Sequence, residues 1–285
     1  MNLRRTKREP NFTKYLISNQ TFKNDVLKVC DVGAREGYPD WLRYYNNQLF
    51  VTGFEADKSE CERLNKIVPC QNTLPYALHK NKRKRTFYLT NQSASCSFYK
   101  PSKFISRIHN EDDLTIKGTI QLETSSLDSF KLNFDFMKLD AEGCELDILK
   151  GAKKTLKSVL GLTVETAFNP THNNQPLFSN IDLFLRKQGF NLYDLITCVY
   201  TRKSLPAIDS KPYYGQVFIG QATYFRDIYD SIESYSENQI LKLVSLMEIF
   251  ALNDCALEIL DKSNLQRQDI DALKALLIPD IGGRK

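Results

Sequence analysis

The chain has 285 residues, enough for one large domain with appendages or for two small ones. Hydrophobic residues make up 42% of it and aromatic residues 11%, which is ordinary for a globular protein with a sizeable core. The formal net charge is +5, from 39 basic and 34 acidic residues, and this imbalance is too mild to identify a class of partner.

Three features bear on where the protein works. The seven cysteines are scattered without a Cys-x-x-Cys pair, which favours reduced thiols over a disulfide framework or a zinc site. Residues 1–8 are basic but no apolar stretch follows them, so we do not expect a secretory signal. No run approaches the roughly 20 apolar residues of a membrane span. We therefore expect a cytoplasmic protein without a membrane span.

Strand and helix patterns alternate from residue 26 onward, which is typical of a parallel sheet covered on both faces. A basic run at residues 80–85 leads into an alternating stretch, which predicts a hairpin or an insertion at the sheet edge. The polar residues 91–118 predict a loop. In this half, the expected strands are 26–32, 50–55 and 73–78, and the expected helices are 38–47 and 59–68.

The alternation continues in the second half of the sequence. A helix over residues 145–158 is expected, because apolar residues from Leu149 to Val159 recur at helical spacing. A later helical face stops at Gly189, a residue type suited to end a helix. The strands expected here are 134–140, 160–165, 191–196 and 217–224, the last of them antiparallel.

The composition changes at residue 226, where helical spacing takes over. Ser236 and Gln239 have the spacing of a capping box, and Ser263 with Gln266 predicts the start of a second helix. We expect a helical pair that packs on the main domain or forms a homodimer contact. The expected organisation is an N-terminal lead with a short helix over 1–25, an α/β doubly wound, Rossmann-like domain over 26–225 and a C-terminal helical extension over 226–285.

A glycine turn follows the first expected strand, in the pattern Asp31-x-Gly33-x-x-x-Gly37, and Glu55 ends the next strand. Glycines let the backbone approach a ligand closely, and an acid at this spacing can accept two ribose hydroxyls. A site for a nicotinamide cofactor typically has the motif Gly-x-Gly-x-x-Gly, which binds the pyrophosphate. The carboxylate of Asp31 instead suits a cationic cofactor without phosphate. The pattern therefore favours S-adenosylmethionine over NAD.

A second acidic segment lies where the strand over 134–140 ends. Asp140 and Glu142 stand at the carboxyl edge of the expected sheet, where open α/β folds bind ligands. Both are expected to point toward the cofactor. Glu145 begins the following helix, and a first-turn acid that complements the helix dipole is the favoured interpretation for it.

Four motifs stand out: Asp31-Val32-Gly33-Ala34-x-x-Gly37, Gly53-Phe54-Glu55, Thr124-Ser125-Ser126-Leu127-Asp128 and Lys138-Leu139-Asp140-Ala141-Glu142-Gly143-Cys144-Glu145. Together they resemble the FkbM family of methyltransferases, over roughly residues 26–225. The resemblance implies the class I methyltransferase-like fold, S-adenosylmethionine as methyl donor, and O-methylation of a sugar, a glycan or another small-molecule hydroxyl. It assigns Asp31, Gly33, Ala34 and Gly37 to the amino-acid end of the cofactor. It assigns Glu55 to the ribose, and Ala77 and Leu78 to the adenine.

A hydroxyl acceptor must lose its proton during transfer, so a base or a metal ion is needed. The candidate bases are Asp140, Glu142, Glu165 and His172. Glu165 ends a strand, and His172 follows in a polar loop expected at the rim that meets substrate. Asp140 with Glu142 could hold a divalent metal, although two carboxylates alone do not establish one.

Two other functions remain open from the sequence. The basic residues 80–85 could contact RNA, which would make the protein an RNA methyltransferase, although a solvated hairpin tip is the favoured interpretation and a nucleic-acid partner is not expected. Alternatively, the chain is a non-catalytic methyltransferase-like scaffold that uses its helical tail for interactions. The presence of Asp31, Glu55, Asp140 and Glu142 argues against the scaffold, which has no physical need for them.

Overall fold

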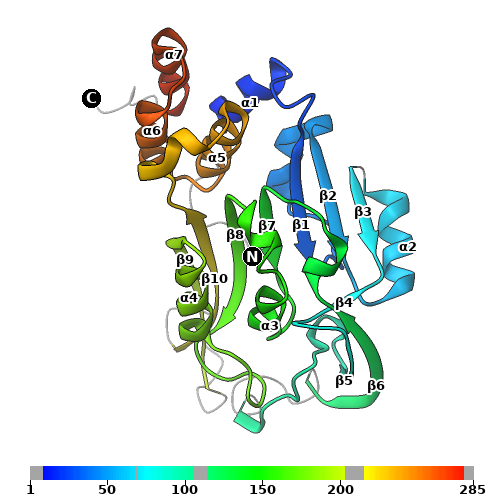
Figure 1. The fold of residues 1–285 in the computed structure, drawn as a ribbon. Coiled ribbons are helices and arrows are strands. Elements are labelled where there is room, and N and C mark those ends of the chain that lie inside the picture. Colours follow the sequence, from blue (N-terminus) through cyan, green and yellow to red (C-terminus); the bar gives the residue numbers. More distant parts are fainter. Residues whose placement is uncertain (1–8, 69, 105–113, 203–214, 279–285) are drawn as a thin grey trace, which may run out of the picture.

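A computed structural model describes residues 9–68, 70–104, 114–202 and 215–278 (Figure 1). Its centre is a seven-stranded sheet in the order β3-β2-β1-β7-β8-β10-β9. All neighbours pair in parallel except β10, which runs antiparallel to β8 and β9. The doubly wound α/β fold with an antiparallel last strand is thereby confirmed. The strands are β1 (Leu27–Val32), β2 (Leu49–Phe54), β3 (Gln71–Leu74), β7 (Phe136–Leu139), β8 (Gly161–Ala167), β9 (Phe190–Tyr200) and β10 (Gln216–Arg226).

Helices cover the sheet through two hydrophobic clusters. One cluster packs α3 and α4 on the sheet, and the other joins the first and last helices of the chain to β1 and β2. None of the helices in the described ranges has the length and apolar character needed to cross a bilayer. The helices are α1 (Asn11–Ser18), α2 (Lys58–Ile67), α3 (Glu145–Lys150), α4 (Phe178–Lys187), α5 (Glu237–Ile249), α6 (Asn253–Lys262) and α7 (Arg267–Leu277), with 3-10 turns that include η1 (Asp40–Gln48) and η5 (Thr155–Lys157).

The third strand differs from expectation. Residues 73–78 do not form one strand, because β3 ends at Leu74 and Pro75, which lacks a backbone N–H, follows it. Ala77–Leu78 is a separate strand, β4, which pairs with β6 (Ile116–Ser125). β6 also pairs with β5 (Arg83–Thr90), so the expected edge insertion is a second, three-stranded sheet. β6 begins within the last residues of the predicted loop 91–118, and residues 105–113 of that loop lie outside the described part.

The helix expected over 145–158 is also shorter than predicted. α3 ends at Lys150, and a separate 3-10 turn follows over Thr155–Lys157. Asp128 explains the break, because its carboxylate accepts hydrogen bonds from the backbone N–H groups of Lys154 and Thr155. A new turn therefore starts there, as at a helix N-terminus.

The described part of the C-terminal extension, up to residue 278, forms three α-helices where we expected two. The capping box of Ser236 and Gln239 is present at the start of α5. α6 was missed because its ten residues carry a short apolar pattern. All three helices contribute to the cluster that covers β1 and β2, so the extension packs on the main domain. Figure 1 shows them with α1 at the end of the sheet opposite the β5–β6 hairpin.

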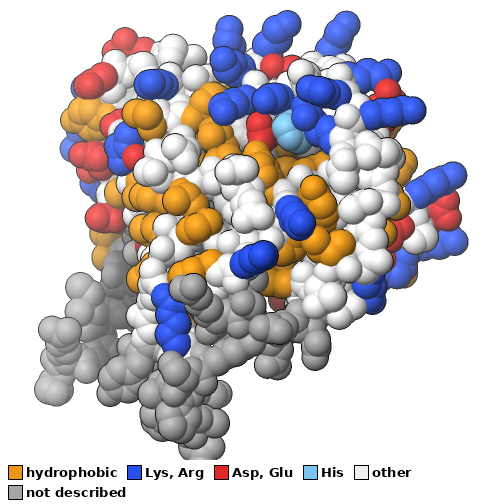
Figure 2. All heavy atoms as spheres, turned by 90° about the horizontal axis from the view of Figure 1, so that it is seen from below, with side chains coloured by type: hydrophobic (Ala, Val, Ile, Leu, Met, Phe, Trp, Pro, Cys, Tyr) orange, Lys and Arg blue, Asp and Glu red, His pale blue; other side chains and the backbone are white. Residues whose placement is uncertain are grey.

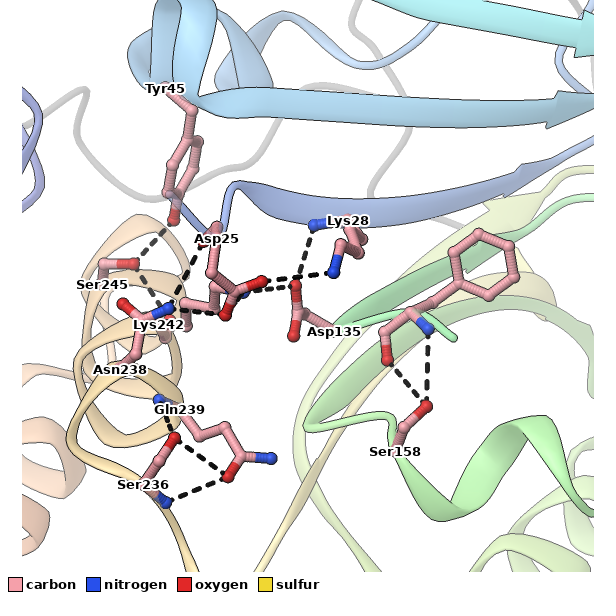
Figure 3. A network of polar contacts seen from close by, with 11 residues as sticks. Asp25, Lys28, Tyr45, Asp135, Ser158, Ser236, Asn238, Gln239, Lys242 and Ser245 are labelled. Carbon is pink, nitrogen blue, oxygen red and sulfur yellow. Dashed lines mark hydrogen bonds and ion pairs between the residues drawn. The ribbon is translucent and has the colours of Figure 1, made fainter. Parts of the chain in front are cut away.

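A buried ion-pair network fastens α5 to the sheet (Figure 3). The ammonium group of Lys242, 1% exposed, lies 3.0 Å from Oδ2 of Asp25 and 3.0 Å from Oδ2 of Asp135. Asp135 also accepts the backbone N–H of Lys28, at the start of β1. One lysine therefore ties α5 to the loops that begin β1 and β7.

Candidate functional site

A cavity of about 1490 Å³ opens at the carboxyl ends of β1, β2 and β7. Gly33 and Gly37 of the glycine turn line it, together with Glu55 at the end of β2. Ala77 and Leu78 of β4 line it as well, so the second sheet forms part of its wall. The cavity extends along the sheet as far as the end of α5. Five of the seven residues that the resemblance assigns to the cofactor therefore share one cavity.

The glycine turn brings two loops into close contact. Gly33 has a φ of +74°, and a Cβ placed on it would lie 1.9 Å from the backbone oxygen of Asp140. Only glycine fits there, both for its conformation and for the space. Gly37, with a φ of +80°, ends the turn. The approach of Gly33 to Asp140 places the glycine turn beside the acidic segment.

Asp31 and Ala34 do not line the cavity. Both are fully buried. The Ala34 methyl group packs where Gly53 leaves room for it. The Asp31 carboxylate accepts no hydrogen bond from the described residues, and burial raises its pKa to about 6 although Lys138 opposes the shift. Neither residue is among those that line the cavity, and their assignment to the cofactor stays a prediction.

Lys138 is a site residue that the sequence analysis did not single out. Its Nζ lies 3.3 Å from Oδ1 of Asp31 and 3.6 Å from Oδ2 of Asp140, and it donates to the backbone oxygen of Gly33. Burial opposes its charge, yet the two carboxylates raise its pKa. The sequence pattern could have identified it. In a strand, a lysine two residues before an acid points to the same side of the sheet as that acid.

Glu55 is half-buried at the rim of the cavity. Its Oε1 accepts the backbone N–H of Asp57, and burial raises its pKa. No hydrogen bond to its Oε2 is found among the described residues that surround it. Arg35 and Glu36 also line the cavity, and Arg35 lies 3.9 Å from Oδ2 of Asp57. Glu55 therefore has one carboxylate oxygen engaged and one able to receive a ligand donor.

Three acids gather beyond Lys138. Oxygens of Asp140, Glu142 and Glu165 all lie within 4.8 Å of one another. Burial first, and then the neighbouring acids, raise the pKa of Glu142 to about 8 and that of Glu165 well above its usual value. Carboxylates are also the ligands that hard divalent cations prefer. Glu165 therefore lies beside Asp140 and Glu142, the two acids that the sequence analysis considered as ligands of a divalent metal.

The loop that carries Glu142 is held in an unusual conformation. Glu142 has a φ of +52° and Gly143 a φ of +96°, both in the left-handed region. The buried carboxylate of Glu145 accepts the backbone N–H groups of Ala141 and Gly143. Glu145 does occupy the first turn of α3, as expected, and it also anchors this loop.

His172 lies in a different place from the other candidate bases. It is only 2% exposed, although its loop predicted a position at the rim. Its Nδ1 lies 2.9 Å from Oγ1 of Thr171, and burial lowers its pKa. His172 lines a second cavity of about 260 Å³, and Glu142 and Glu165 line both cavities. The structure thus brings three candidate bases together and places the fourth on the neighbouring cavity.

The sheet order and the cavity at its carboxyl edge define a class I methyltransferase fold. The family model described as the Methyltransferase FkbM domain matches residues 31–192, more than half of the chain. The chain therefore belongs to the FkbM family of methyltransferases. A search of curated proteins finds no match.

Similar solved structures are distant from this chain. Magnesium protoporphyrin IX methyltransferase from Synechocystis, with bound SAM, is 10% identical, covers 76% of this chain and 79% of its own, and has a TM-score of 0.36. A putative RNA methyltransferase from Pyrococcus horikoshii is 10% identical, with coverages of 79% and 88% and a TM-score of 0.35. TrmK of M. capricolum, with S-adenosyl-homocysteine, is 12% identical, with coverages of 91% and 92% and a TM-score of 0.33. Likeness at this level says nothing about ligand or substrate.

Proposed function

We propose that this FkbM-family protein transfers a methyl group from S-adenosylmethionine to a hydroxyl oxygen of a sugar, a glycan or another small molecule. The observation that carries the proposal is the meeting of the glycine turn with the acids at the ends of β7 and β8, on one cavity. The turn supplies close backbone contact with a donor. The acids supply groups that can take a hydroxyl proton.

The residues around the large cavity fit this methyl donor. Gly33 and Gly37 offer backbone without side chains for its amino-acid end, and Glu55 keeps an oxygen for a ribose hydroxyl. Ala77 and Leu78 give an apolar wall for adenine. Asp31 and Ala34 would shape the turn from behind. When bound, S-adenosylmethionine supplies a methyl carbon attached to a positively charged sulfur.

The acids of the site would handle the proton of the acceptor. Transfer of the methyl group to the acceptor oxygen would release S-adenosylhomocysteine, and the hydroxyl proton would pass to a base of this chain. Asp140, Glu142 and Glu165 lie near the ends of β7 and β8. Burial, and after it the proximity of the other acids, raises the pKa of Glu142 and of Glu165. His172, neutral because it is buried, is the remaining candidate. Holding the acceptor in line with the donor would supply much of the rate.

The experiment that tests the proposal is incubation with isotopically labelled methyl donor and a metabolite extract from the source of the protein. We expect the label in a small molecule as a methyl ether, identified by mass spectrometry. Label in methylamines or in RNA would contradict O-methylation of a small molecule. Absence of label in every fraction, together with no binding of the donor in calorimetry, would favour the scaffold alternative.

RNA methylation is the weaker alternative. Figure 2 shows Lys and Arg side chains gathered on one side of the face seen from below, with hydrophobic side chains beside them. Three of the basic side chains in the run at 80–85 have local partners. Lys80 lies 3.9 Å from Asp147, Lys82 lies 3.8 Å from Glu123 and Arg85 donates to Asn81. A solvated surface explains this run without RNA. RNA binding that weakens steeply with salt would overturn that view.

A further inference from the structure

Two basic runs that lie far apart in the sequence meet on one surface. The first is the run at 80–85, and the second, over 150–157, spans the end of α3 and the η5 turn. A Cβ placed on Gly151 would lie 2.6 Å from the backbone oxygen of His79 and 3.0 Å from Cα of Lys80, so the two runs are in contact. We call the two runs together the basic surface. Its nine basic side chains are Lys80, Lys82, Arg83, Lys84, Arg85, Lys150, Lys153, Lys154 and Lys157.

The side chains of the basic surface face outward. Ala152, Thr155 and Leu156 of the second run are buried, which leaves the four lysines of that run exposed. In the first run, only Arg85 among the basic residues is partly buried. A single short run of charge is ordinarily a solvated surface, as the residues 80–85 would be alone. Two adjoining runs instead concentrate positive charge in one place.

The charges of both runs act on the same buried imidazole. Burial lowers the pKa of His79 to about 4, and Asp147 opposes this shift. Arg85 and Lys80 of the first run and Lys150 of the second lower the pKa of His79 further. The two runs therefore form a single region of positive potential.

Nearby acids compensate this charge only in part. Lys80 and Lys82 lie 3.9 Å and 3.8 Å from Asp147 and Glu123, and both lysine side chains stay half or more exposed. Ion pairs of this exposed kind contribute little and exchange readily for other anions. Within the described ranges, no ion pair involves Arg83 or the lysines at positions 84, 150, 153, 154 and 157. These six cations are available to an anionic partner.

Apolar side chains continue from the basic surface along the same two strands. In the β5–β6 pair, Arg85 lies opposite Leu122, and Phe87 lies opposite Ile120. Ile120 is 42% exposed, and Tyr76, which precedes β4, is 45% exposed. Figure 2 likewise shows hydrophobic side chains beside the Lys and Arg side chains of the face seen from below. A lipid bilayer accepts this combination, because cations contact anionic headgroups while apolar side chains enter the interface beneath them.

RNA fits the same features less well. Seven of the nine basic residues are lysines, which are point charges without the planar fork that arginine uses for bidentate recognition of phosphates and bases. Bases of RNA stack on aromatic or guanidinium planes, and the exposed Ile120 offers neither. The combination of lysines with an exposed aliphatic side chain therefore favours a membrane surface over RNA.

We propose that the basic surface docks this protein on an anionic phospholipid membrane, with the side chain of Ile120 entering the interface. Phe87, Ile120 and Leu122 also line the large cavity, so the docked membrane lies beside that cavity. The association is peripheral and electrostatic in the main. This inference goes beyond the proposed function and does not depend on methyl transfer.

Co-sedimentation with lipid vesicles tests the inference directly. The probes are vesicles of phosphatidylcholine alone and vesicles of phosphatidylcholine with phosphatidylglycerol in equal parts. We expect binding only to the vesicles that contain phosphatidylglycerol. Binding should be lost at about 1 M salt, where the Debye length falls to about 3 Å. Absence of binding to the anionic vesicles, or equal binding to both kinds, would overturn the inference.

Competition with RNA separates the two classes of polyanion. Total transfer RNA is added to the vesicle-bound protein at an equal concentration of phosphate. We expect most of the protein to stay on the vesicles. Displacement of the protein by the RNA would overturn the inference in favour of a nucleic-acid partner.

Paired substitutions in each run test whether both runs contact the membrane. Arg83→Gln with Lys84→Gln alters the first run, and Lys153→Gln with Lys157→Gln alters the second. Each cation near an anionic surface contributes about fivefold in affinity, so each pair should weaken vesicle binding about ten- to thirtyfold. All four side chains are exposed, so the thermal unfolding temperature should stay unchanged.

The matched control for these variants is Lys23→Gln with Arg267→Gln. Both residues are exposed, and α7, which contains Arg267, lies at the end of the molecule opposite the β5–β6 hairpin (Figure 1). Vesicle binding of this control should equal that of the wild type. An equal loss in the control and in both paired variants would show that only net charge matters, which would contradict a defined docking surface.

Ile120→Asp tests the apolar part of the contact. Thr119→Asp is its control, because it adds the same charge to an exposed neighbour that points to the opposite face of β6. We expect Ile120→Asp to weaken binding to the anionic vesicles more than Thr119→Asp does. An equal effect of the two substitutions would contradict entry of Ile120 into the interface.

Discussion

The ammonium group of Lys138 lies 3.3 Å from the carboxylate of Asp31, a residue with no exposed surface at the end of β1. The same group lies 3.6 Å from Asp140, at the end of β7. Lys138 therefore joins the glycine turn to the acidic segment by charge, in addition to the close approach of Gly33 and Asp140. The geometry of the candidate site depends on this lysine.

Substitution Lys138→Met is expected to destabilise the fold by about 3–5 kcal/mol at neutral pH, since it leaves a buried carboxylate without a counter-charge. Urea denaturation followed by circular dichroism measures this. Lys80→Met is the control, because Lys80 is half-exposed and lies 3.9 Å from Asp147. An equal, small effect in both variants would show that the Asp31–Lys138 pair contributes nothing. Adding Asp31→Asn to Lys138→Met should restore part of the loss.

Asp31 should make stability fall as pH rises. Its pKa is about 6 in the folded protein against 3.8 for an ordinary aspartate, so the folded state holds the proton more tightly. The stabilisation from this proton is present below pH 4 and is lost as pH rises to about 6, a change of about 3 kcal/mol. The difference in unfolding free energy between wild type and Asp31→Asn, measured over this range, should show that slope. A difference independent of pH would contradict the shifted pKa.

Lys242 should be essential for docking of the C-terminal helices. Lys242→Met leaves Asp135 buried without its partner, and a loss of about 3–5 kcal/mol is expected. Lys274→Met removes the more exposed pair with Asp261 and should change stability by less than about 1 kcal/mol. Chemical denaturation of the two variants makes the comparison. Similar midpoints would mean that the α5 network is dispensable.

Glu55→Ala is expected to weaken the binding of S-adenosylhomocysteine by a few kcal/mol at most, since charged hydrogen bonds to ribose are lost. Isothermal titration calorimetry gives the value. Glu60→Ala, which removes a nearby acid paired with Arg63 and outside the cavity, is the control. Unchanged affinity in Glu55→Ala would refute the ribose assignment.

If Glu142 is the base, methyl transfer should depend on its ionisation. Its pKa of about 8 means that kcat/KM rises with pH until Glu142 has lost its proton. Glu142→Gln should remove this rise and lower the rate by about 10²–10⁴-fold. His172→Ala should lower turnover without moving the inflection or weakening cofactor binding. An unchanged pH profile in Glu142→Gln would mean that another acid is the base.

The alternation of strands and helices was enough to predict the main sheet, because each buried strand and its covering helix are local in sequence. The second sheet was not predicted, since β4 pairs with a strand more than 35 residues later. His172 and Ala34 show the same limit within the site. A polar loop predicts exposure for His172, yet tertiary packing buries it; Ala34 belongs to the glycine turn, yet its side chain faces Gly53.

Calorimetric titration of the purified protein with S-adenosylhomocysteine and, in parallel, with NAD tests the central claim most directly. Binding of S-adenosylhomocysteine that weakens in Glu55→Ala, with no heat from NAD, is the expected result. Binding of the dinucleotide with S-adenosylhomocysteine ignored would contradict the assignment of this cavity to a methyl donor.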